Sequence, residues 1–178
     1  MTARYSLGSR SVELELLGYE YEFHDWRPPD DDYGQNWLQV RAKLSDGLDS
    51  REVTAGLMLT WEVARLATWL DEVASGNFNQ FPYSGIEGYP GFEIEKRPSQ
   101  TTFMKVSLAW SPEYEEPLVV EFDADPLLLR AFASQLRSEL QRFPIQLLRS
   151  DGVARREAAM VGRVFGTRAD RHLRRWGR

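Results

Sequence analysis

The 178-residue sequence contains no cysteine. Without cysteine the chain can form neither a disulfide nor a thiolate metal site, and it has no cysteine nucleophile. No apolar run approaches the roughly 20 residues that a membrane helix needs. The first ten residues also lack the apolar core of a secretory signal. We therefore expect a protein of the reducing cytoplasm that makes no contact with a membrane.

Histidine is almost as scarce, because His24 and His172 are the only two in the sequence. Zinc would have to rely on these two side chains, and His172 stands among arginines, where positive charge disfavours a metal ion. No nucleophile elbow of the form Gly-x-Ser-x-Gly occurs. Gly85, Gly88 and Gly91 are spaced three apart, which matches turn glycines and no phosphate-binding loop. The sequence therefore predicts neither a metal nor another cofactor.

Carboxylates are abundant, with 27 aspartates and glutamates. With so many, some pair will lie at the separation of about 5 to 10 Å that acid and base catalysis uses, so their availability does not indicate an active site. Glu87, near Tyr83 and Tyr89 in a glycine-containing loop, is the one candidate for such chemistry, and it would need a deep pocket around it. We expect a protein without enzymatic activity.

Charge divides the chain into two parts. Residues 145–178 hold nine arginines against three acidic residues, a net charge of +6. Since the whole chain has a formal charge of −5, residues 1–144 carry −11. An acidic body repels nucleic acid and attracts basic partners, although ordinary solubility accounts for the same charge. We expect an acidic domain at 1–144 and a basic, partly helical extension at 145–178.

The first half of the chain alternates apolar and polar residues with the period of a β-strand. Residues 12–16 place three aliphatic side chains on one face and two glutamates on the other. Residues 38–44 repeat the pattern, and the turn pair Asp46-Gly47 precedes an extended stretch at 51–57. Three antiparallel strands are expected here.

Helices and further strands follow in the same order. A helix is expected from Thr60, as its N-cap, to Gly76 just past its end. Three strands at 92–95, 104–110 and 118–123 come next, and Asp125 then caps a helix. Its apolar stripe contains Leu129, Phe132, Ala133, Leu136, Leu140 and Phe143. The order βββα-βββα predicts an α+β fold, in which two helices cover a mostly antiparallel sheet.

Two acidic segments with aromatic residues are the candidates for partner binding. Between the first two expected strands lie Asp25, Trp26, Asp30, Asp31, Asp32 and Tyr33. Between the last two lie Glu113, Tyr114, Glu115 and Glu116. Carboxylates can pair with lysine and arginine while an aromatic ring supplies a desolvated anchor. A solvated loop is the plain alternative for each segment.

The basic extension supports a different hypothesis. Its last part carries Arg168, Arg171, Arg174, Arg175 and Arg178. Clustered arginines neutralise phosphates, so this extension could bind RNA or DNA while the acidic domain acts as its carrier.

Three stretches resemble the WapI-like immunity proteins: 36–41, reading Asn-Trp-Leu-Gln-Val-Arg, then 59–70, and 91–94, reading Gly-Phe-Glu-Ile. In that bacterial family a Leu-Glu-Leu strand and an aspartate-rich loop precede the Asn-Trp-Leu strand, and a Leu-Thr-x-Glu helix follows. The likeness spans about residues 12–143. It implies an antitoxin that binds the C-terminal nuclease domain of a secreted toxin inside the producing cell. It transfers no binding residue by position.

Overall fold

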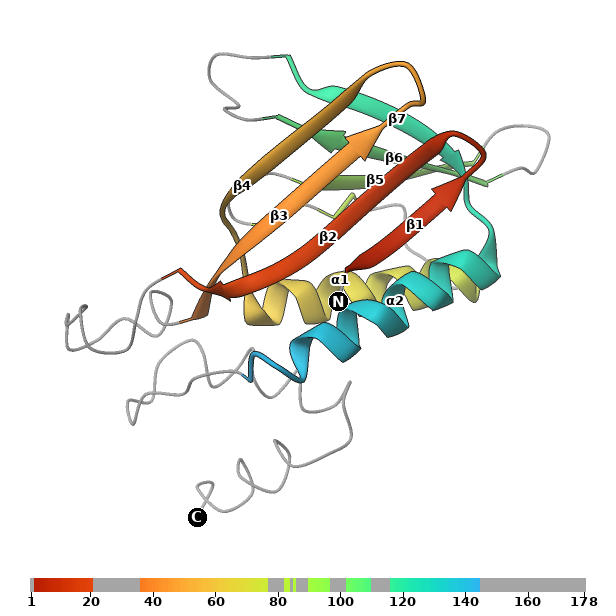
Figure 1. Cartoon of the computed structure of the whole chain (residues 1–178). Coiled ribbons are helices and arrows are strands. Elements are labelled where there is room, and N and C mark those ends of the chain that lie inside the picture. Colours follow the sequence, from red (N-terminus) through yellow and green to blue (C-terminus); the bar gives the residue numbers. More distant parts are fainter. Residues whose placement is uncertain are drawn as a thin grey trace.

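Seven strands and two helices make up the described part of this computed structural model (Figure 1). The strands form two antiparallel sheets, which confirms the α+β expectation. The residues that the structure describes are 2–20, 36–76, 82–83, 85, 90–96, 102–109 and 116–144. The expected helical extension at 145–178 lies outside them.

The first sheet is a four-stranded antiparallel meander whose strand order follows the chain. Its strands are β1 (Ala3–Leu7), β2 (Arg10–Tyr19), β3 (Trp37–Ser45) and β4 (Ser50–Leu59). The expectation of three strands missed β1, which pairs with β2 through a two-residue turn. Gly8 enters that turn with φ of +62°, a conformation that glycine adopts without the steric cost of a side chain.

Helix α1 (Thr60–Ala74) follows β4 directly. Thr60 is its first helical residue and Leu59 its N-cap, so the expected cap position was wrong by one residue. The Leu59 amide donates to Oε2 of Glu62 at 2.8 Å, and this carboxylate satisfies one of the free donors at the helix start. The Thr60 hydroxyl donates instead to Oδ1 of buried Asn36 at 3.1 Å.

The second sheet has three antiparallel strands with β6 in the centre. They are β5 (Gly91–Lys96), β6 (Thr102–Leu108) and β7 (Leu118–Asp123). Helix α2 (Pro126–Leu140) follows, and the expected N-cap is confirmed. Oδ1 of Asp125 accepts from the amides of Leu127 at 2.8 Å and Leu128 at 3.0 Å.

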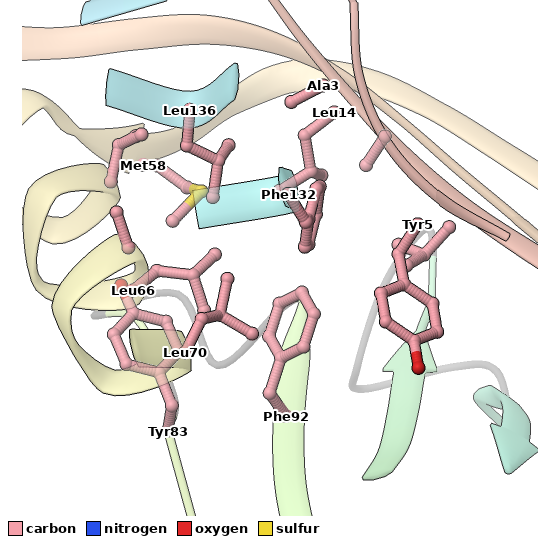
Figure 2. Packing of buried hydrophobic residues seen from close by; sticks show 14 of the residues in the cluster. Ala3, Tyr5, Leu14, Met58, Leu66, Leu70, Tyr83, Phe92, Phe132 and Leu136 are labelled. Atoms are coloured by element: carbon pink, nitrogen blue, oxygen red, sulfur yellow. The ribbon is translucent and has the colours of Figure 1, made fainter. Parts of the chain in front are cut away.

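One apolar cluster lies between the sheets and the helices. Strand β3 contacts β6 and β7, and the two helices pack against each other below the sheets (Figure 1). The expected stripe of α2 is buried from Leu129 to Leu140. Phe143 was also expected in this helix but lies three residues past its end, where it is partly buried against the core. Figure 2 shows Leu70 and Phe92 beside residues of that stripe. Both sheets therefore bury one face and turn the other outward.

Side chains of the first sheet also bond the main chain of the second. The Tyr5 hydroxyl donates to the carbonyl of Asp123. Arg10 Nη1 donates to the carbonyl of Glu121 at 2.8 Å. These bonds fix β7 relative to the β1–β2 hairpin.

Candidate functional site

Most residues predicted to bind a partner lie outside the described part of the chain. These are Asp25, Trp26, Asp30, Asp31, Asp32, Tyr33, Glu113, Tyr114 and Glu115, the alternative arginines Arg168, Arg171, Arg174, Arg175 and Arg178, and Glu87. Glu116 is described and exposed, and its carbonyl accepts from Arg51 Nη1 at 2.7 Å. Their roles stay predictions.

The fold attaches the two predicted acidic segments to distant points. Residues 21–35 connect β2 to β3 at the end of the first sheet where Trp37 pairs with Leu59. Glu116 is held by Arg51, close to the other end of β4. From Arg51 to Leu59 a strand covers about 26 Å at the usual rise per residue. A partner that contacts both attachment points must therefore span the length of the first sheet.

The outer face of the first sheet carries charges that offset one another. One cross-strand row alternates in sign and contains Arg4, Glu13, Lys43 and Glu52. Within this row Arg4 pairs with Glu13 at 3.3 Å, and Lys43 pairs with Glu52 at 4.0 Å. Arg41 and Glu15 form an ion pair in the neighbouring row. Glu20, just after β2, places a fourth carboxylate against Gly56 on this side of the sheet. With three cations and four carboxylates, this face has a net charge of about −1.

The outer face of the second sheet has a different composition. We name it the acidic sheet face, and it consists of Glu93, Glu95, Phe103, Lys105, Ser107, Val119, Glu121 and Asp123. These residues alternate along β5, β6 and β7 with buried ones such as Phe92, Val106 and Phe122, which places them opposite the core. Four carboxylates stand against one ammonium group, so the acidic sheet face has a net charge of about −3 at neutral pH.

Lys105 stands in the middle of the acidic sheet face. Its Nζ lies 2.7 Å from Oε2 of Glu95 and 3.7 Å from Oε1 of Glu121. The hydrogen bond to the Glu95 carboxylate raises the pKa of Lys105 above its usual value, and Glu121 adds to the effect. Lys105 therefore stays protonated and links both outer strands of the sheet.

Two apolar side chains belong to the same face. Val119 is 51% exposed. Phe103 is partly buried and lies in the row between Glu95 and Asp123. Apolar contacts bordered by charge are the usual composition of a protein–protein interface.

The sequence pattern indicated these three strands but did not single out their carboxylates. Glu93, Glu95, Glu121 and Asp123 all occupy polar positions of an alternating stretch. Alternation shows that they point away from the core. Only the strand register shows that they share one face with a single lysine.

Across the described ranges, no three histidine, aspartate or glutamate side chains form a group that could hold a metal ion. None of the helices described there is long and apolar enough to cross a membrane.

Within the described residues, these features define the class: a small α+β protein with two antiparallel sheets, two helices and an acidic sheet face. The chain belongs to the immunity protein WapI-like family, whose model matches residues 5–144. Membership confirms the resemblance drawn from the sequence and gives a protein toxin as the class of partner. The matched span contains both sheets from Tyr5 onward and both helices, and it ends where the basic extension begins.

The other comparisons add little. No curated protein matches the chain. Among solved structures, that of the plant transcriptional regulator PBF-2 matches with 10% identity and a TM-score of 0.37, covering 80% of this chain and 83% of that one. A TM-score of this size does not establish a shared fold.

Proposed function

We propose that the chain neutralises a cognate toxin with a nuclease domain by binding that domain without catalysing a reaction. Family membership supports a toxin as partner. The net charge of −11 on residues 1–144 supports a toxin domain with a basic surface. A nuclease has such a surface because it binds the phosphates of nucleic acid. Carboxylates of the immunity protein would take the place of those phosphates and keep nucleic acid out.

Charge and apolar contacts have separate roles in this proposal. Opposite charges speed the encounter, so each toxin molecule is captured before it reaches nucleic acid. A lasting complex also needs desolvated anchors, because exposed charge pairs contribute little to affinity. The predicted segments offer both, with charge from Asp25, Asp30, Asp31, Asp32, Glu113, Glu115 and Glu116 and rings from Trp26, Tyr33 and Tyr114.

A test starts from the gene neighbourhood. The C-terminal domain of the toxin encoded beside this chain is expressed in bacteria with and without the chain. We expect growth arrest by the toxin domain alone and normal growth when both are present. With purified proteins, degradation of nucleic acid should stop at a molar ratio of about one to one, since a binding inhibitor acts stoichiometrically.

Three results would contradict the proposal. A neighbourhood without a toxin gene removes the partner. Nuclease activity that persists in a large excess of the chain removes the inhibition. Inactivation of many toxin molecules by one molecule of the chain would show catalysis instead of binding.

A further inference from the structure

The two sheets differ in charge although both turn one face outward. On the first sheet, each of three carboxylates has a cation beside it. Among the described residues of the acidic sheet face, four carboxylates stand against one cation, Lys105, which pairs with Glu95 and Glu121. A partner that approaches the outer face of the first sheet meets about one negative charge, because Glu20 adds a carboxylate to the three ion pairs. A partner that approaches the second sheet meets about three negative charges.

From this asymmetry we propose that the acidic sheet face is the docking surface for a basic protein partner, the toxin domain. The inference rests on the proposed function, because it takes the toxin as the occupant. It adds a folded surface to the two acidic segments predicted from the sequence. One of those segments is continuous with it, since Glu116 leads directly into β7.

The register gives the acidic sheet face a defined layout. Glu93 and Glu121 flank Lys105 in one row, and Glu95 and Asp123 flank Phe103 in the next. The carboxylates therefore line the two outer strands, which lie about 10 Å apart across β6. An arginine of the partner could pair with Glu93 on β5 or with Asp123 on β7, both of which are exposed.

Other occupants of this face fit less well. Nucleic acid would meet like charge. A second copy placed face to face would bring eight carboxylates together with two lysines, which is strongly repulsive. The basic extension at 145–178 does match the face in charge. It is therefore the competitor that the experiment must separate from the toxin.

The experiment compares two full-length double variants with equal charge change. Glu93→Gln with Asp123→Asn alters the acidic sheet face, where both side chains are exposed. Glu13→Gln with Glu52→Gln is the matched control on the first sheet. Surface plasmon resonance measures the association rate and Kd with the neighbouring toxin domain at low and at high salt, and thermal unfolding checks that both variants are folded.

We expect the acidic-sheet variant to associate roughly fivefold or more slowly at low salt, because steering depends on local charge. The control should stay within about twofold, and high salt should remove the difference by screening. Equal slowing by both pairs would mean that only total charge matters, and it would overturn the proposal. Unchanged association of the acidic-sheet variant would overturn it as well.

Two further measurements show which other contact is made if the acidic sheet face does not bind the toxin. If Asp30→Asn, Asp31→Asn and Asp32→Asn together slow association while the acidic-sheet variant does not, the toxin binds the segment at 21–35. If the acidic-sheet variant leaves toxin binding unchanged but speeds tryptic cleavage within 145–178, the face holds that extension. In both cases wild-type chain still neutralises the toxin, so the proposed function stands. A wild type that fails to neutralise contradicts the proposed function itself.

Discussion

Among single residues, Tyr83 shows most clearly how burial changes the pKa of a side chain in this protein. Its hydroxyl donates to the carbonyl of Glu62 at 2.6 Å, and its ring packs near Trp69 and Phe92. Burial raises the pKa of Tyr83 above the ordinary value for tyrosine, and the charge of Glu62 adds to the shift. Burial likewise raises the pKa of Tyr5 in β1. Neither phenol therefore ionises readily in the folded chain.

This shift makes stability depend on pH in the alkaline range. Because the folded-state pKa of Tyr83 lies above the unfolded value of 10.0, its stabilising effect is complete below that pH and is lost as the pH rises further. We expect Tyr83→Phe to reduce the alkaline slope of the unfolding free energy by about 1.4 kcal/mol per pH unit. Near neutral pH it should cost about 1 kcal/mol through the lost hydrogen bond.

Urea unfolding of both proteins between about pH 8 and about pH 11 measures this effect in the range where tyrosine titrates. Tyr5→Phe is a useful companion, because the pKa of Tyr5 is raised by the same cause. Alkaline curves that run parallel for wild type and Tyr83→Phe would show that this phenol does not contribute.

The N-caps of the two helices show what a local sequence pattern can and cannot predict. Asp125 could be assigned from the sequence, because an aspartate before Pro126 combines a cap acceptor with a favoured first helical residue. Thr60 has the right residue type for a cap and was misplaced by one position. There the buried carboxylate of Glu62 serves the Leu59 amide, while the Thr60 hydroxyl bonds Asn36 from a distant part of the chain. A local sequence pattern around Thr60 does not contain Asn36, so it could not predict this bond.

At the scale of elements, alternation predicted five strands, and the turn pair Asp46-Gly47 predicted the sixth, β4, whose last three residues are all buried. Strand β1 follows the same alternation with Ala3 and Tyr5 buried, yet five residues are too few for the pattern to stand out. The division into two sheets and the strand register depend on contacts across the core, which no local pattern contains. For that reason the carboxylates of the acidic sheet face could be placed outward from sequence, but not beside one another.

Lys105 allows a prediction opposite in sign to the carboxylate variants. Lys105→Gln removes the one cation of the acidic sheet face, so association with the toxin domain should become roughly twofold faster at low salt. Lys43→Gln on the first sheet is the matched control, since it changes the net charge equally. Association rates from the same binding assay measure both. Equal acceleration by the two variants would show that the position of the charge has no influence.

At the scale of the whole molecule, the chain joins an acidic body to a basic extension. The family match covers residues 5–144, and the apolar cluster of the described residues extends no further than Phe143. The Tyr19 hydroxyl donates to the carbonyl of Pro144, which ties the last described residue to β2. The body therefore contains the elements that a packed core requires, and the extension adds a charge of +6 beyond them.

Truncation after Pro144 separates the two functional hypotheses. If the body binds the toxin, residues 1–144 should keep the melting temperature within a few degrees and should still neutralise the toxin domain, because the described core is intact. If the extension binds nucleic acid, mobility-shift assays should find salt-sensitive binding by the full chain and none by the truncated form, since arginines release counterions from phosphates. Neutralisation that disappears on truncation, in a fragment that still melts cooperatively, would move the toxin-binding surface into 145–178. That result would contradict a role for the acidic body alone, because the carboxylates of β5–β7 remain in place in both forms.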